Sequence, residues 1–223
     1  MPTPSFTAIF NAARQRHGAA VIEARLPQPK SASELAAVAD DRYLSHMSLR
    51  IFRAGLKHSL VDAKWPAFEE VFAGFEPRRL RAMSDEALEQ LLGDARLIRH
   101  WGKLKSVRDN ASAMLTIDEE FGGFGSWLGT WPGQNIVGLW EALADRFSQM
   151  GGMSGPMFLR MVGKDTFVLS KSVIAGLKRW VDMPEPKNRT GRAAVQACFN
   201  SWAAETGRPL SQLSLILAMS VDD

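Results

Sequence analysis

The sequence contains a single cysteine, Cys198, among its 223 residues. One cysteine excludes a disulfide within the chain and fits a reducing compartment. The four histidines, which are His17, His46, His58 and His100, are not spaced as metal ligands are. We therefore expect no metal site, and no zinc site in particular.

Long apolar runs are also missing. No stretch approaches the ~20 consecutive apolar residues that cross a bilayer, and no basic segment followed by an apolar one opens the chain as in a secretory leader. We therefore expect a cytoplasmic protein rather than a membrane or secreted one. The excess of one charge sign is small, because 27 Lys and Arg face 24 Asp and Glu and give a formal net charge of +3. This balance permits nucleic-acid binding without requiring it.

The alternation of apolar and polar residues that marks a β-strand is absent as well. The chain is 46% hydrophobic and 23% charged, which is ordinary for a soluble protein with a substantial core. Almost every segment has helical spacing of its apolar residues, so the sequence predicts an all-α fold. Helices are predicted at 4–17, after the capping box of Ser31 and Glu34, and at 41–55, 66–72, 85–92, 97–114, 127–131, 137–149, 156–162, 170–180, 191–206 and 209–219.

Two proline-containing linkers indicate how the chain is divided. The first is Pro27-Gln28-Pro29-Lys30, and the second surrounds Pro184 and Pro186. Linkers of this kind lie between packed segments. They predict an N-terminal helical extension at 1–30, a central domain at 31–182 and C-terminal helices at 183–223 that pack on it.

The glycine-rich stretch 150–156, Met-Gly-Gly-Met-Ser-Gly-Pro, is the most distinctive feature. It lies between the predicted helix 137–149 and an apolar run at 157–162, so it indicates a helix, a glycine hairpin and a second helix. Pro156 fits a first helical position. Unpaired N–H groups at the start of a helix bind anions such as phosphate. The alternative is a plain turn between two helices, which is the more common occurrence.

Five further pieces occur in a characteristic order with this hairpin. They are Phe52-Arg53-Ala54-Gly55-Leu56, Lys64-Trp65-Pro66-Ala67-Phe68-Glu69, Phe72-Ala73-Gly74-Phe75-Glu76-Pro77, Leu97-Ile98-Arg99-His100-Trp101-Gly102-Lys103 and Asn110-Ala111. In this order, from about residue 40 to about residue 179, the chain resembles the DNA-3-methyladenine glycosylase I family of helix-hairpin-helix DNA glycosylases.

The resemblance implies a helix-hairpin-helix glycosylase fold and an activity. Such an enzyme would hydrolyse the N-glycosidic bond of an alkylated purine such as 3-methyladenine in double-stranded DNA, after flipping the base out of the stack. It would need no cofactor and would act as a monomer associated with the nucleoid. Two alternatives remain: a catalytically reduced homologue that binds damaged or distorted DNA, and a helical interaction protein without a role on DNA.

The family pattern assigns residues to a base pocket, and this chain departs from it. Family members often hold a structural zinc with two cysteines and two histidines, which this chain lacks. The aromatic residue that stacks on the base falls at His58, and the glutamate that recognises the methylated base falls at Arg50. Related glycosylases place a catalytic aspartate after the hairpin, where the nearest carboxylate here is Asp165. Arg50 and Asp165 are therefore the catalytic candidates, with Tyr43, Arg50, His58 and Trp65 as base-pocket candidates.

Several of these residues also have an ordinary structural interpretation. Arg50 could instead pair with Glu69 or Glu70 on the surface, and Asp165 could cap a helix or form a turn. DNA binding is predicted for Gly151, Gly152, Ser154, Gly155, Arg99 and Lys103. Arg96, Arg99 and Lys103 would share one helix face, which could touch phosphates or simply be solvated.

Overall fold

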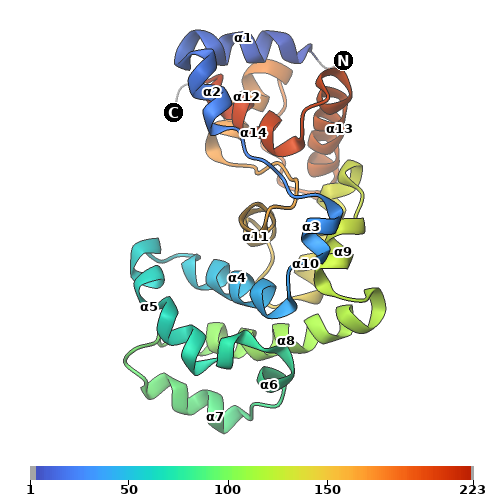
Figure 1. The fold of residues 1–223 in the computed structure, drawn as a ribbon. Coiled ribbons are helices and arrows are strands. Elements are labelled where there is room, and N and C mark those ends of the chain that lie inside the picture. The colour runs from blue at the N-terminus through green and yellow to red at the C-terminus, as the bar shows by residue number, and fades with distance from the viewer. Residues whose placement is uncertain (1–3, 222–223) are drawn as a thin grey trace. The chain divides into compact units, whose positions relative to one another are not determined.

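The computed structural model describes residues 4–221, and within that range every regular element is a helix (Figure 1). The all-α fold class is therefore confirmed. No helix among these residues is long and apolar enough to span a bilayer. Two compact units are present, which we call the terminal unit (4–29, 132–139 and 165–221) and the central unit (30–131 and 140–164).

The central unit contains most of the sequence pieces singled out above. Its elements are α3 (Ala32–Ala36), α4 (Asp40–Arg53), α5 (His58–Val71), η1 (Ala73–Phe75), α6 (Pro77–Arg81), α7 (Asp85–Gln90), η2 (Leu91–Gly93), α8 (Trp101–Phe121), α9 (Phe124–Thr130), residues 140–146 of α10 (Ile136–Arg146), and α11 (Ser154–Val162). Helix α4 is the centre of this arrangement, because α5, α8, α9 and α11 all pack on it. Figure 1 shows α8 running beside α4 and α6.

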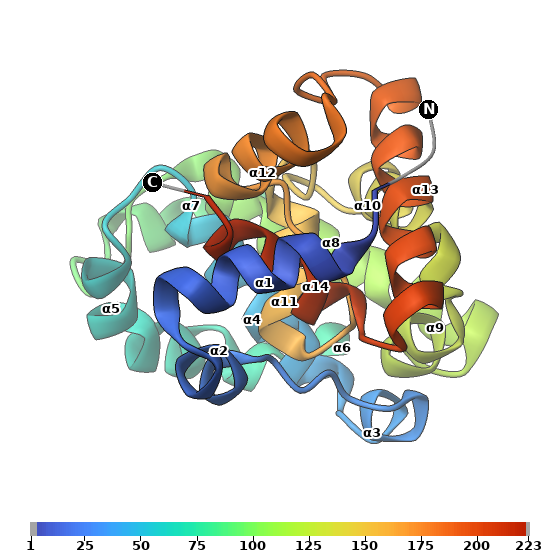
Figure 2. The same ribbon diagram turned by 90° about the horizontal axis from the view of Figure 1, so that it is seen from above.

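The terminal unit is discontinuous in sequence. It contains α1 (Phe6–His17), α2 (Ala19–Arg25), η3 (Gly133–Asn135), the first residues of α10, α12 (Lys171–Val181), α13 (Arg189–Thr206) and α14 (Leu210–Met219). Helix α14 packs on α1, α12 and α13 (Figure 2). Because α12 and the α11–α12 connection pack with the terminal helices, residues 165–182 group with the two ends of the chain, whereas the linkers placed them in the central domain.

Several helices begin at residues whose side chains cap them. The side chains of Ser84 and Ser170 accept hydrogen bonds from the backbone of the first helical turn, and Ser31 with Glu34 forms the predicted capping box. Gly18 and Gly55 follow helix ends with positive φ angles of 77°, a conformation that glycine adopts without strain.

Two predicted helix starts are wrong, in each case because a local signal was overridden. Pro66 lies inside α5, which begins eight residues earlier at His58. Helix α8 begins at Trp101 rather than at 97, because His100 is extended and caps it through a hydrogen bond with the Lys103 backbone N–H. Helices α2 and α6 were not predicted at all.

Gly125 lies inside α9 at a close contact between helices. A Cβ at Gly125 would lie 2.2 Å from the backbone oxygen of Leu35, and one at Gly129 would lie 2.8 Å from that of Ala32. These distances are far below van der Waals contact. The two glycines, four residues apart on one helix face, therefore let α9 approach the backbone of α3.

Candidate functional site

The glycine hairpin forms the start of α11. Gly152 has a φ of 60° and α11 begins at Ser154, so Pro156 is the third helical residue and not the first as predicted. Its missing N–H is still without cost, because the first bond into the helix is donated by Met157 to the Met153 carbonyl. The Ser154 N–H is used within the turn, where it donates to the Gly151 carbonyl over 3.1 Å.

The remaining N–H groups of the hairpin are not used by the fold, and those of Gly151, Gly152 and Met153 belong to exposed residues, whereas Gly155 is buried. Within residues 4–221, those of Gly151, Gly152, Met153 and Gly155 donate no hydrogen bond. No side chain caps α11. The helix dipole adds a partial positive charge at the same place. The hairpin therefore has the donors and the electrostatic sign of an anion site.

Two side chains hold the hairpin against α8. The amide of Asn110, which is fully buried, accepts from the Ser148 N–H over 2.7 Å and donates to the Ser148 carbonyl over 3.2 Å. Gln149, with a positive φ of 62°, donates from Nε2 to the Gly102 carbonyl over 2.6 Å. These bonds fix the peptide segment that leads into the glycine turn. The anchoring role of Asn110 has no signal in its local sequence.

Arg50 lies in the last turn of α4, which packs on α11. Its side chain is half-buried, and its Nε is fully buried without a hydrogen-bond partner among the described residues. The predicted surface pairs with Glu69 or Glu70 do not form. Glu69 receives the guanidinium of Arg42 and Glu70 that of Arg96. Burial and the nearby charge of Arg53 lower the pKa of Arg50.

Lys103 is buried and is a structural residue in this unit, not the phosphate contact predicted for it. Its ammonium group donates to the carbonyl oxygens of Phe52 (3.2 Å) and Ala54 (2.7 Å), which are at the end of α4. The shared cationic face of Arg96, Arg99 and Lys103 does not form, because the first two residues precede α8. Arg99 is exposed, and it remains a candidate for contacting phosphate.

The turn from α4 to α5 exposes an unusual set of side chains. His58 is the first residue of α5 and is exposed. Leu56 and Leu60 on either side of it are 37% and 50% exposed. An imidazole flanked by accessible apolar side chains is suited to stacking on a base. The exposed leucines were not singled out from the sequence, since their burial depends on how the turn packs.

Tyr43 and Trp65, both predicted to line the base pocket, are less exposed than side chains that contact a base need to be. Tyr43 is 1% exposed, and its hydroxyl donates to the Leu35 carbonyl over 2.8 Å. Burial raises its pKa to about 12. Trp65 stacks on Phe68 and donates its indole N–H to the hydroxyl of Ser45 over 3.2 Å. Tyr43 is therefore a core residue, whereas Trp65 is half-buried within an aromatic cluster.

Asp165 belongs to the terminal unit, where its carboxylate caps α14. One oxygen accepts from the Leu210 N–H and the other from the Ser211 N–H, both over 2.9 Å. Pro209, the N-cap residue of α14, has no side-chain acceptor, so the carboxylate of Asp165 caps the helix instead. The helix-capping interpretation therefore accounts for both oxygens of Asp165.

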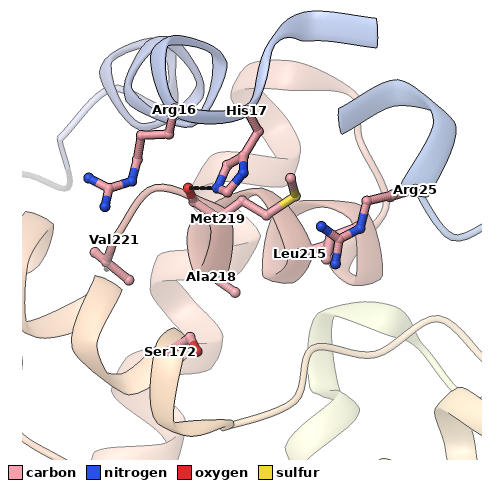
Figure 3. Close-up of a pocket in the computed structure, with 8 residues that line it drawn as sticks. All are labelled: Arg16, His17, Arg25, Ser172, Leu215, Ala218, Met219 and Val221. Carbon is pink, nitrogen blue, oxygen red and sulfur yellow. Dashed lines mark hydrogen bonds between the residues drawn. The ribbon is translucent and has the colours of Figure 1, made fainter. Parts of the chain in front are cut away.

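A separate cavity of about 390 Å³ lies within the terminal unit (Figure 3). It is lined by Arg16, His17, Arg25, Ser172, Leu215, Ala218, Met219 and Val221. The His17 ring lies 3.1 Å through Nε2 from the Met219 carbonyl. None of the predicted site residues lines this cavity.

The part of the chain that the structure describes contains no cluster of three or more His, Cys, Asp or Glu side chains suited to a metal ion. Cys198 is buried, and burial raises the pKa of its thiol to about 12. It is thus an inert core residue rather than a ligand or nucleophile.

The solved structures that residues 4–221 resemble are DNA glycosylases of the helix-hairpin-helix fold class. A 3-methyladenine DNA glycosylase I has a TM-score of 0.51 at 21% identity, covering 70% of this chain and 87% of its own. The 8-oxoguanine DNA glycosylase of Methanocaldococcus jannaschii has a TM-score of 0.51 at 15% identity, covering 95% and 92%.

The comparison of the sequence with family models identifies the family. The family model described as methyladenine glycosylase matches residues 35–151, and the chain belongs to this family. DNA-3-methyladenine glycosylase 1 of Escherichia coli (strain K12) is 36% identical over 67 residues. That stretch is 30% of this chain and 36% of the relative, so the alignment spans about a third of the curated protein. The family predicted from the sequence is confirmed.

Proposed function

We propose that the protein is a monofunctional DNA glycosylase of base-excision repair, which hydrolyses the N-glycosidic bond of alkylated purines such as 3-methyladenine. The observation that carries the proposal is the hairpin of α11, with its open N–H groups, in a chain of the methyladenine glycosylase family. Its partner would be double-stranded DNA with an alkylated base, and the protein would act as a monomer without a cofactor.

In this proposal the hairpin binds one phosphate of the DNA backbone through the N–H groups of Gly152, Met153 and Gly155. The base leaves the duplex stack, since its reacting bond is inaccessible there. The exposed ring of His58 then stacks on it. Because alkylation makes the base a good leaving group, positive charge on the sugar needs only water, phosphates and fixed dipoles for stabilisation. No catalytic role is assigned to Asp165, whose oxygens are both used by α14.

The activity is tested by incubating the purified protein with a duplex that contains one alkylated purine. A monofunctional glycosylase leaves an abasic site in an uncut strand, which breaks only after treatment with hot alkali. The expected result is strand breakage after alkali and none before it. Breakage before alkali would contradict the monofunctional assignment, and no abasic sites would contradict the activity.

The hairpin is tested at Met153, which is 39% exposed and stands at the N-cap of α11 without capping it. Met153→Asp and Met153→Asn introduce side chains of nearly the same size and shape at this exposed position, so they should affect the fold alike. Only the aspartate brings a negative charge to the phosphate. We expect Met153→Asp to bind duplex DNA at least about tenfold more weakly than Met153→Asn, and wild-type binding to weaken steeply with salt.

Equal affinity of the two Met153 variants would show that the hairpin does not hold a phosphate. A substitution at Gly155 is a poorer probe, because a Cβ there would lie 3.2 Å from the Met150 carbonyl oxygen and would disturb the turn itself.

A further inference from the structure

Gln149, which comes directly before the glycine-rich stretch 150–156, has a left-handed backbone conformation. Its φ is 62°, where a residue with a Cβ is strained and glycine is not. The residue is exposed, so burial does not hold it in this conformation. The hydrogen bond from its Nε2 to the Gly102 carbonyl, over 2.6 Å, does so instead. Backbone strain that is held by one specific contact is an indication of function.

The bond contributes little to the stability of the fold. An exposed amide exchanges a bond with water for a bond within the protein, so its net contribution is small. The strain at a positive φ has a cost of similar size. Because the two effects nearly cancel, the side chain of Gln149 is not needed for folding. What the bond does fix is the direction of the peptides that follow.

This bond is the second of two anchors between the segment and α8. The first is the buried amide of Asn110, which bonds the N–H and the carbonyl of Ser148 over 2.7 and 3.2 Å. Gly102 and Asn110 are eight residues apart on α8, which is about 12 Å along the helix axis. A single anchor leaves the chain free to turn about one point, whereas two separated anchors do not. Together they set the direction in which the backbone enters the hairpin.

The peptides that follow have no other such constraint. Gly151, Gly152 and Met153 are exposed, and their N–H groups donate no hydrogen bond within residues 4–221. The Ser154 N–H closes the turn onto the Gly151 carbonyl but does not direct these three groups. Two of the three residues are glycines, whose backbone is the least restricted. Their common direction therefore depends on how the chain is held before the turn.

We infer that Gln149 is a positioning residue for phosphate binding, because its bond to α8 directs the N–H groups of the hairpin toward one phosphate of the DNA backbone. This inference rests on the proposed function and adds to it a residue that acts through the hairpin. It predicts that phosphate binding and stability respond differently to substitutions of Gln149.

Two substitutions separate positioning from stability. Gln149→Asn has an amide that is one methylene too short to reach Gly102, and asparagine adopts a positive φ more readily than glutamine. It should unfold at the same urea concentration as the wild type or at a higher one. Gln149→Met keeps the length without the donor and keeps the strain, so it should unfold at a lower urea concentration. Both should lose phosphate positioning to the same extent.

The measurement is the ratio of the affinities of Met153→Asn and Met153→Asp for an unmodified DNA duplex. This ratio reports a phosphate beside residue 153, and a loss of other contacts cancels in it. With Gln149 in place we expect a ratio of at least about tenfold. It should fall below about threefold when the Met153 pair is combined with either Gln149 variant. Gln90→Asn is the matched control, at an exposed position that ends α7, and it should leave the ratio unchanged.

The possible failures are distinguishable. A tenfold ratio that persists with both Gln149 variants would overturn the positioning role and leave the proposed function intact. A ratio that falls only with the less stable Gln149→Met would overturn it too, since loss of structure would then be the cause. A ratio near one with Gln149 in place would contradict the phosphate site itself. The expected ratios without release of any alkylated base would uphold the role of Gln149 and contradict the glycosylase activity alone.

Discussion

At the residue scale, buried charged side chains account for much of the local structure. Lys103 is 7% exposed, yet it carries an ammonium group that satisfies two carbonyls left open at the end of α4. Carbonyls at helix ends need such partners, and cations are favoured there. Lys103 therefore stabilises the end of α4, although its position in the motif around His100 predicted that it would contact DNA phosphate.

Replacing Lys103 with methionine should keep the packing and remove both charge-assisted bonds. We expect a loss of about 2 kcal/mol in the free energy of unfolding, measured by urea denaturation. Lys105→Met is the control, because Lys105 is 43% exposed and pairs only with Asp109. It should change stability by less than about 0.5 kcal/mol. Equal effects of the two substitutions would contradict the capping role of Lys103.

The lowered pKa of Lys103 predicts that the free energy of unfolding depends on pH. Burial, and then the charge of Arg50, lower the pKa of Lys103 in the native state. Between this lowered value and the unfolded value of about 10.4, the unfolded chain binds more protons, so stability rises with pH. The stability advantage of the wild type over Lys103→Met should therefore grow as the pH rises toward 10. A constant difference over that range would argue against a shifted pKa.

At the element scale, close helix packing depends on two glycines of α9. Gly125 and Gly129 leave room for the backbone oxygens of α3, and any side chain there meets backbone that cannot move aside cheaply. We expect Gly125→Ala to destabilise the protein by about 3 kcal/mol or more. Gly93→Ala, where a Cβ meets nothing within 4 Å, should be nearly neutral. Thermal unfolding of both variants decides this, and a neutral Gly125→Ala would show that α3 and α9 are not packed so closely.

The sequence predicted elements where the signal was local. The side chains of Ser84 and Ser170 and the capping box at Ser31 act within a few residues of themselves, so they could be recognised from spacing. The helix start predicted at 66 was wrong because tertiary packing decides what Pro66 does, and a proline is tolerated inside α5. The close contact that Gly125 makes with α3 likewise depends on tertiary packing.

The candidate site was predictable only in part, for the same reason. The hairpin is continuous in sequence and was found from its glycines. Glu69 pairs with Arg42 of α4 and Glu70 with Arg96, so nothing in the spacing predicted that Arg50 would have no carboxylate partner among residues 4–221. The burial of Lys103 is likewise a property of the packed helices.

At the scale of the whole molecule, the chain forms two units rather than a domain with two extensions. The terminal unit brings α1 together with α12, α13 and α14, from opposite ends of the sequence. Contacts at such separation leave no periodic signal in the sequence. The linker at 27–30 coincides with a boundary between units, whereas the boundary near 165 has no proline or glycine cluster to mark it.

Release of free purine bases from methylated duplex DNA under single-turnover conditions, followed by chromatography, tests the proposed glycosylase activity most directly. We expect the wild type to release 3-methyladenine slowly but above the spontaneous rate. Arg50→Glu should release it faster if Arg50 lies in the proposed base pocket, because a carboxylate would then replace a like charge beside the cationic base. If neither protein releases more base than buffer alone, the glycosylase assignment is wrong.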